Sequence, residues 1–106
     1  MSFIGETSLV IDIGSNDGVF LKPLKNLGIQ ILGIDPARNI VKIANSRKLK
    51  TILGYLNKNL VEKILKDYKK ADLVTAFNVF AHNDNLHEMI DNIEKLLKPR
   101  GSFIFE

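Results

Sequence analysis

Short runs of apolar residues recur along the whole chain of 106 residues, and most of them are rich in β-branched side chains. Polar residues rarely alternate with the apolar ones inside these runs. This pattern is typical of strands that are covered on both faces, as in a parallel sheet. Glycine directly follows the first and third runs and marks their ends. The predicted strands are residues 9–13, 29–34, 51–53, 73–77 and 102–105.

Segments with the 3.6-residue period of a helix lie between the predicted strands. Pro23 falls in the first turn of the first helix, where its missing N–H does no harm, and Gly28 ends that helix. The second helix is predicted to start at Pro36. The apolar positions of the four helices are Phe20, Leu24 and Leu27; Ile40, Ile43 and Ala44; Leu60, Ile64, Leu65 and Tyr68; and Leu86, Met89, Ile90, Ile93, Leu96 and Leu97.

The fourth helix has the clearest stripe, and its limits can be predicted as well. Asp84 or Asn85 is the expected N-cap, because short polar side chains accept hydrogen bonds from the first free amides of a helix. Pro99 and Gly101 predict a turn that ends the helix, after which the last strand begins at Ser102.

The alternation of strands and helices along the chain predicts an α/β fold. Right-handed crossovers between successive strands give a Rossmann-like parallel sheet of about five strands, in the order 3-2-1-4-5, with helices on both faces. Residues 1–106 are expected to form one domain. A ligand is expected in the crevice at the carboxyl ends of the strands, where the strand order reverses between the first and fourth strands.

The composition narrows the possible functions. The net charge of +3 comes from lysines that are spread along the chain, which favours a solvated surface over a nucleic-acid site. The absence of cysteine excludes disulfides, zinc–thiolate sites and cysteine nucleophiles from this stretch. No apolar run approaches the ~20 residues that span a bilayer, and no signal peptide is visible. We therefore expect a cytoplasmic protein with no membrane, metal or nucleic-acid partner.

The segment that leaves the first strand and enters the first helix contains the strongest functional signal, and it reads Asp12-Ile13-Gly14-Ser15-Asn16-Asp17-Gly18. Glycine is needed where the backbone turns sharply or approaches a ligand closely, and Gly14 and Gly18 fit these roles. Asn16 stands where many such loops have a third glycine. Asparagine is among the few residues that tolerate the left-handed backbone region, so the loop can keep its shape.

A second signal is Asp35, at the end of the second predicted strand. An acidic residue about 20 residues beyond a glycine-rich loop can accept hydrogen bonds from both ribose hydroxyls of an adenosine. The alternative role of Asp35 is to cap the helix that follows it. The loop and the acid together favour a ligand that contains adenosine.

The charges of the loop distinguish two classes of adenosine cofactor. Dinucleotides require the pattern G-x-G-x-x-G at their pyrophosphate, and this loop has Asn16 and Val19 at two of the glycine positions. Asp17 would also repel a pyrophosphate. S-adenosylmethionine has no phosphate, and its sulfonium and amino groups are cationic, so Asp12 and Asp17 are compatible neighbours. The loop therefore favours S-adenosylmethionine over NAD.

Several of these segments resemble a known enzyme family. Residues 12–18 look like motif I of the class I S-adenosylmethionine-dependent methyltransferases, and Leu97-Lys98-Pro99-Arg100-Gly101 looks like their turn before the fifth strand. More narrowly, the Gly-Ser-Asn-Asp-Gly loop, Gly33-Ile34-Asp35-Pro36, Ala71-Asp72-Leu73-Val74 and Asn78-Val79-Phe80-Ala81-His82 resemble C-methyltransferases that act on nucleotide-linked deoxysugars. The resemblance implies S-adenosyl-L-methionine as cofactor and a small-molecule methyl acceptor, such as a nucleotide-linked sugar.

The chain departs from that family near both ends. The family has a cysteine-rich zinc module before this domain and a tyrosine–glutamate–histidine cluster, implicated in catalysis, just after the fifth strand. This chain has no cysteine and its last residue is Glu106. We therefore expect a truncated class I methyltransferase core that binds the cofactor but is incomplete for catalysis. A non-catalytic nucleotide-binding module and an NAD-binding Rossmann domain remain as alternatives.

The expected site combines the loop, the acid and a few residues near the crevice. Tyr55 follows the third strand and is a candidate for stacking on adenine, and Asn78 ends the fourth strand, where a plain turn residue is the alternative. His82 is the candidate catalytic base, since its unperturbed pKa of ~6.5 suits proton transfer and the resemblance places a histidine there. A structural role in its loop is the alternative. The predicted cofactor-binding residues are Asp12, Gly14, Ser15, Asn16, Asp17, Gly18, Asp35, Pro36, Tyr55 and Asn78.

The fifth predicted strand suggests how copies of the chain associate. Residues 102–105 contain two phenylalanines and an isoleucine and no charge. In the class I fold this strand is covered by later strands that this sequence lacks, so we expect it to be an edge strand. Exposed apolar edges pair with other chains, so we expect a homodimer or aggregation through this edge, or fraying of the edge in the monomer. The alternative is that the terminal helices fold over the edge and hide it.

Overall fold

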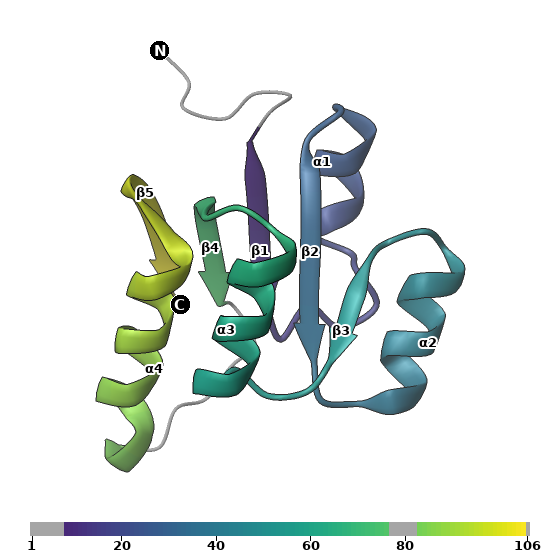
Figure 1. Cartoon of the computed structure of the whole chain (residues 1–106). Helices are drawn as coiled ribbons and strands as arrows, with labels where there is room; N and C mark the ends of the chain where they lie inside the picture. Colours follow the sequence, from purple (N-terminus) through teal and green to yellow (C-terminus); the bar gives the residue numbers. More distant parts are fainter. Residues whose placement is uncertain (1–7, 77–82, 106) are drawn as a thin grey trace.

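The computed structural model describes residues 8–76 and 83–105 and shows strands and helices that alternate along the chain (Figure 1). The side chains of residues 83–86 and 105 are not described. The elements are β1 (Leu9–Ile13), α1 (Leu21–Asn26), β2 (Gln30–Asp35), α2 (Arg38–Ser46), β3 (Thr51–Leu53), α3 (Lys58–Asp67), β4 (Ala71–Ala76), α4 (Asn83–Leu96) and β5 (Leu97–Phe105).

The strands form one parallel sheet in the order β3-β2-β1-β4-β5 (Figure 1). This confirms the predicted fold and strand order. Because β1 pairs with β2 on one side and β4 on the other, the strand order reverses between β1 and β4. The segments that leave the carboxyl ends of β1 and β2 lie beside this point, where open α/β sheets bind their ligands.

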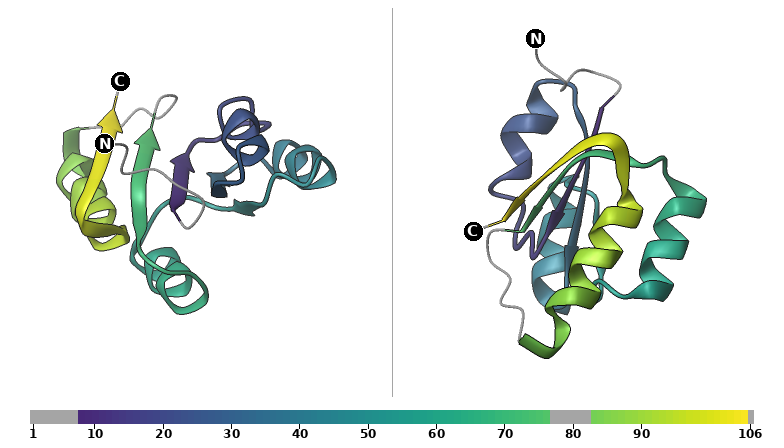
Figure 2. Two further views of the ribbon diagram at one scale, coloured as in Figure 1. Left: turned by 90° about the horizontal axis from the view of Figure 1, so that it is seen from above. Right: turned by 90° about the vertical axis from the view of Figure 1, so that its left-hand side faces the viewer.

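Helices cover both faces of the sheet (Figure 2). On one face α1 and α2 contact β2 and β3, and on the other face α3 and α4 pack together, with α4 against β4 and β5. All five residues of β1 are buried, because this strand is central and is covered from both sides. The apolar runs without alternation in the sequence therefore reflect a two-sided core, as predicted.

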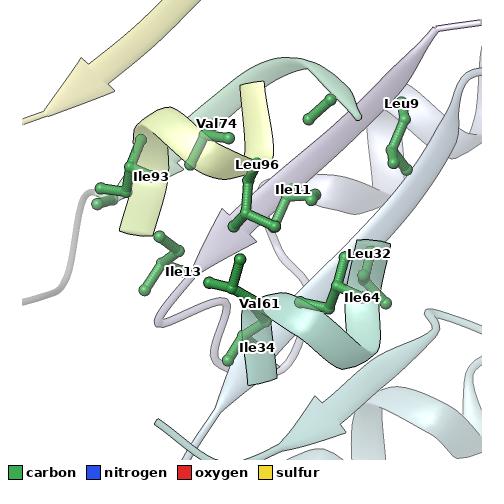
Figure 3. Close-up of a cluster of buried hydrophobic side chains, with 12 residues drawn as sticks. Leu9, Ile11, Ile13, Leu32, Ile34, Val61, Ile64, Val74, Ile93 and Leu96 are labelled. Atoms are coloured by element: carbon green, nitrogen blue, oxygen red, sulfur yellow. The ribbon is translucent and has the colours of Figure 1, made fainter. Parts of the chain in front are cut away.

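The larger of two apolar clusters lies between the sheet and the pair α3–α4 (Figure 3). Alternate residues of β1 point into it, while Val10 points to the α1–α2 face and joins the second cluster. Each fully buried aliphatic side chain contributes about 1.5–3 kcal/mol. The fully buried members from the two helices are Val61, Ile64, Ile93 and Leu96. This face is an apolar core, whereas the α1–α2 face also contains polar side chains.

Two helices begin at residues other than those predicted. α2 begins at Arg38 rather than Pro36, because the Asp35 carboxylate accepts the N–H of Ala37 and holds the chain in a turn before the helix starts. α4 begins at Asn83, so Asp84 and Asn85 lie inside its first turn and neither is the N-cap. Three adjacent residues of cap-forming type leave the start undetermined by sequence alone.

The last strand also begins earlier than predicted. β5 follows α4 directly and starts at Leu97, which pairs with Ala71, while Ser102 pairs with Leu73. Residues 98–101 therefore bulge out of the ladder opposite Asp72. The predicted turn at Pro99 and Gly101 is this bulge within the strand. No helix in the described parts of the chain is long and apolar enough to cross a membrane.

Candidate cofactor site at the carboxyl edge of the sheet

The glycine-rich loop after β1 has a regular alternation of backbone conformations. Its φ angles are 72° at Gly14, 58° at Asn16 and 91° at Gly18, all in the left-handed region. Glycine and asparagine adopt this region with the least strain. Asn16 thus replaces a glycine without changing the loop, as the sequence predicted. A side chain at Gly18 would also collide with Leu49, since a Cβ there would lie 2.5 Å from the Leu49 Cδ1.

The backbone amides of this loop are bound within the protein. The N–H groups of Gly14 and Ser15 both donate to the carbonyl oxygen of Ile34, at 2.7 and 3.1 Å, and Gly18 donates to the carbonyl of Ser15 at 3.1 Å. The N–H of Asn16 donates to Asp35 Oδ2 at 2.9 Å. A pyrophosphate needs such amides free to donate. The loop is therefore pinned to the end of β2 and presents few free donors to a dinucleotide.

Asp35 joins the loop to the turn that follows β2. Its Oδ2 accepts the N–H of Asn16 and its Oδ1 accepts the N–H of Ala37, each at 2.9 Å. A carboxylate has about four acceptor positions. Asp35 is only partly buried, so it keeps capacity for the two hydroxyls of a ribose while its orientation is fixed. The backbone carbonyl of Asp35 also accepts the N–H of Gly54, which places Tyr55 beside this edge with 74% of its surface exposed.

A row of short side chains crosses the sheet beneath the loop. The strand register aligns Thr51 with Gly33, Gly33 with Asp12, and Asp12 with Thr75. All lie on the α1–α2 face, and Thr51, Asp12 and Thr75 are buried. Thr75 Oγ1 donates to Asp12 Oδ1 at 2.7 Å, and Thr51 Oγ1 donates to the carbonyl of Leu49 at 2.8 Å. The face that supports the loop is thus polar where the opposite face is apolar.

Gly33 makes room in this row for a side chain from the loop. A Cβ on Gly33 would lie 2.4 Å from Ser15 Oγ and 3.1 Å from Thr51 Oγ1, so Ser15 occupies the space above the glycine. Ser15 is 3% exposed, and its Oγ has no hydrogen-bond partner among the described residues. The Ser15 side chain therefore lies under the loop, against the sheet.

Asp12 is the buried charge of the row. Only 4% of its surface is exposed. Burial raises the pKa of its carboxyl, the Thr75 hydrogen bond lowers it, and the negative charge of Asp35 raises it again, with a net value of about 6. A buried carboxyl that titrates near neutrality at a ligand crevice is typical of a functional site.

Asp17 is the second acid of the loop. Its Oδ2 lies 3.7 Å from Nη1 of Arg47, at the end of α2, and the two side chains are partly exposed. Its Oδ1 is buried and has no hydrogen-bond partner within the described parts of the chain. The loop thus contains two polar oxygens, on Ser15 and Asp17, that are buried without a donor. Ser15 Oγ lies against the sheet, whereas the unpaired carboxylate oxygen of Asp17 fits a ligand that brings N–H groups or positive charge.

Three further residues were predicted to belong to the site, namely Pro36, Asn78 and His82. Pro36 is exposed, next to Asp35 and outside helix α2. Asn78 and His82 lie outside the described residues. Within the described residues, no group of histidine, cysteine, aspartate and glutamate side chains could hold a metal ion.

Thr75, Gly33 and Thr51 were missed by the sequence analysis, although each leaves a signal. Thr75 is a hydroxyl within an otherwise apolar strand, and Gly33 is a glycine in the middle of another strand. A glycine in a strand often marks a close approach of other atoms. What connects them is the register of the sheet, which places both residues beside Asp12.

A sequence profile described as a methyltransferase domain matches residues 3–106. The chain belongs to this family. It has the class I fold that the sequence predicted, and membership in the family argues against the alternative of an NAD-binding domain, as the bound loop amides do.

The sequence of this methyltransferase domain is similar to parts of two longer enzymes, among others. Over 98 residues the chain is 36% identical to the C-methyltransferase NovU of Streptomyces niveus, a match that covers 92% of this chain and 23% of that protein. It is 33% identical over 98 residues to the mitochondrial ubiquinone biosynthesis O-methyltransferase of Rattus norvegicus, covering 88% of this chain and 28% of that one. The chain spans about a quarter of the length of these relatives.

Solved structures share the fold of the methyltransferase domain. The S-adenosylmethionine-dependent methyltransferase of Thiobacillus denitrificans, determined in complex with S-adenosyl-L-homocysteine, superposes with a TM-score of 0.67 at 21% identity. The match covers 93% of this chain and 41% of that structure. A similar methyltransferase from Archaeoglobus fulgidus superposes with a TM-score of 0.72 at 22% identity, over 92% of this chain and 43% of the other.

Proposed function

We propose that this methyltransferase domain binds S-adenosyl-L-methionine between the glycine-rich loop and Asp35. The observation that carries the proposal is the chemistry of the loop. Its amides at Gly14, Ser15 and Asn16 are bound to the end of β2, while Asp17 Oδ1 is an acidic oxygen without a hydrogen-bond partner among the described residues. Such a loop suits a cofactor with cationic groups and no phosphate.

The proposed contacts follow from the positions of the side chains. Asp35 accepts hydrogen bonds from the two ribose hydroxyls, and Tyr55, with Pro36 at the same edge, borders the adenine. Gly14 and Gly18 let the backbone approach the cofactor, and Asn16 holds the loop in shape. Asp12, beneath the loop, and Asp17 supply negative charge, with Ser15 seating the loop on the sheet. When bound, S-adenosylmethionine supplies the methyl group.

We propose a small-molecule methyl acceptor, such as a nucleotide-linked sugar. The support is the identity with NovU, whose name describes a C-methyltransferase, together with the segments that resemble deoxysugar C-methyltransferases. The ubiquinone O-methyltransferases among the relatives make an oxygen acceptor the alternative. In carbon methylation a base removes a proton next to a carbonyl. His82 remains the proposed base, and Asn78 remains a proposed cofactor-binding residue. The cytoplasmic location also stays a prediction.

Calorimetric titration of the chain with S-adenosylhomocysteine tests the cofactor proposal. The Asp35→Ala variant removes a charged acceptor of two ribose hydroxyls, so its affinity is expected to fall by about 1.5–3 kcal/mol. Asp91→Ala is the matched control, because Asp91 is exposed on α4, on the other face of the sheet. An unchanged dissociation constant for Asp35→Ala would remove Asp35 from the site, and tight binding of NAD alone would overturn the proposal.

We also propose that two copies associate through β5. This strand ends the sheet and pairs with β4, and Ile104 on it is 47% exposed. The Ile104→Lys variant places a charge on the edge, which disfavours strand pairing between copies. Light scattering over a range of concentrations is expected to show association of the wild type and a monomeric variant. A wild type that stays monomeric at high concentration would contradict the proposal.

A further inference from the structure

The side chain of Thr75 is placed where it serves Asp12 rather than the core. Thr75 lies on β4 directly beside Asp12 on β1 and is fully buried. Its Oγ1 donates to Asp12 Oδ1 at 2.7 Å, the short distance typical of a hydroxyl that donates to a carboxylate. Its neighbours Leu73, Val74 and Ala76 are apolar and buried. Valine has nearly the same shape and would fill this place without a hydroxyl, so packing alone does not explain a threonine.

The charges around Asp12 indicate what the Thr75 hydroxyl does. Among the charged groups, Asp35 on β2 opposes ionisation of Asp12. Asp17 in the loop is paired with Arg47 from the end of α2, and Asp72 on β4 lies toward the other end of the sheet and is paired with Lys98. The aligned positions on β4 and β2 are Thr75 and Gly33, which carry no charge. Among these described neighbours of Asp12, the Thr75 hydroxyl is therefore the group that favours the charged form of the carboxyl.

We infer that Thr75 is a positioning residue for cofactor binding: its hydroxyl fixes the Asp12 carboxylate beneath the glycine-rich loop and stabilises its negative charge. This inference rests on the proposed function, in which that charge attracts the cationic groups of S-adenosylmethionine. Thr75 itself is too deeply buried to touch the cofactor. Its effect on affinity passes through the ionisation of Asp12 and therefore depends on pH, unlike an effect on packing.

The test is calorimetric titration with S-adenosylmethionine between pH 5.5 and 8.5. In Thr75→Val the affinity is expected to fall about twofold near pH 7 and to approach a tenfold loss near pH 5.5, since a hydrogen bond to a charged group is worth about one pKa unit. The pH at which affinity reaches half of its maximum rises by about one unit, because the same free energy raises the pKa of Asp12. Thr75→Ser keeps the hydroxyl and is expected to bind as the wild type does.

Thr51→Val is the matched control. It also removes a buried hydroxyl from the row, one that donates to the carbonyl of Leu49, and it leaves Asp12 with its partner. We expect its affinity and pH profile to be those of the wild type. In an Asp12→Asn background, Thr75→Val is expected to lose its pH-dependent effect, because the group through which it acts no longer titrates. Circular dichroism verifies that each variant folds, and Thr75→Ala replaces Thr75→Val if the valine variant does not.

The outcomes separate this inference from the proposed function. If the wild type fails to bind S-adenosylmethionine at every pH, the proposed function falls and the inference with it. If the wild type binds but Thr75→Val binds equally well with an unmoved pH profile, only the role of Thr75 is overturned. The same holds if Thr51→Val shows an equal loss and an equal shift, because the effect would then come from general loosening beneath the loop.

Discussion

Two buried or partly buried carboxylates, Asp12 and Asp72, lie on the adjacent central strands β1 and β4, toward opposite ends of the sheet. Asp72 Oδ2 accepts the N–H of Leu9 at 2.8 Å, and its Oδ1 accepts the ammonium of Lys98 at 2.9 Å. Although burial alone would raise the pKa of Asp72, the bonds to Leu9 and Lys98 outweigh it and lower the pKa. Among the described residues, the hydrogen-bond partner of Asp12 is a neutral hydroxyl, and its pKa is raised to about 6.

We interpret this difference as one between a structural acid, Asp72, and an acid of the proposed cofactor site, Asp12. Asp72 connects β1, β4 and the bulge of β5, and its partners stabilise the charge it carries. Asp12 is buried without a cation among its described contacts, so at neutral pH its charge opposes folding. Proteins keep such unfavourable groups where a ligand needs them. The buried charge of Asp12 at the carboxyl edge of the sheet therefore lowers the stability of the fold, whereas the paired charge of Asp72 at the amino edge raises it.

The largest expected effect is that of Asp12→Asn. The pKa of Asp12 rises from 3.8 to about 6 on folding, and each unit corresponds to about 1.4 kcal/mol. The amide keeps the hydrogen bond from Thr75 and removes the buried charge. We expect the free energy of unfolding at pH 8 to increase by about 2–3 kcal/mol, measured by urea denaturation, while affinity for S-adenosylmethionine falls.

The pH dependence gives the sign of this effect. A carboxyl whose pKa is raised in the folded state binds its proton more tightly there, so its contribution favours folding in acid and is lost as pH rises through about 6. The advantage of Asp12→Asn over the wild type should therefore shrink between pH 6 and pH 4. A variant that is less stable than the wild type at pH 8 would show that Asp12 is structural.

A smaller effect of opposite sign is expected for Asp72→Asn. The amide still accepts from Leu9 but loses the ion pair with Lys98, whose side chain is 40% exposed. Because solvent screens such a pair, the loss at pH 7 should be about 0.5–1 kcal/mol. Urea denaturation measures it, and calorimetry is expected to show unchanged cofactor affinity.

Acid removes the difference in stability between Asp72→Asn and the wild type. A lowered pKa means that the stabilisation by Asp72 is complete above its unfolded value of 3.8 and is lost as pH falls through the folded value. The stabilities of Asp72→Asn and the wild type should converge as the pH falls below the lowered pKa of Asp72. If the gap persisted there, the loss would come from packing rather than from charge.

Most of the fold could be predicted from the sequence, because strands buried on both faces and helices with one apolar stripe have distinct patterns. The left-handed conformation of Asn16 followed from its place between Gly14 and Gly18. Element limits were less certain wherever neighbouring residues compete for one role, as at Asn83 and Asp84. The start of β5 was missed because a bulge depends on pairing with β4.

The side-chain contacts inside the site could not be predicted from the sequence, because they depend on how the strands align. Asp12 and Thr75 are separated by 63 positions in the chain, and Ser15 meets Gly33 only because the loop folds back over β2. Sequence patterns show which residues are polar but not which strands align them. The register of a parallel sheet decides that, and it is set by the packing of the whole domain.

The most direct test of the central claim is a calorimetric titration of the chain with S-adenosylmethionine at pH 6, repeated in two buffers with different heats of protonation. We predict that the wild type binds with release of protons, because a cation near Asp12 lowers its pKa, and that Asp12→Asn releases no protons. NAD should give no binding heat. Binding of NAD in place of S-adenosylmethionine, or cofactor binding with no proton release by the wild type, would contradict the account.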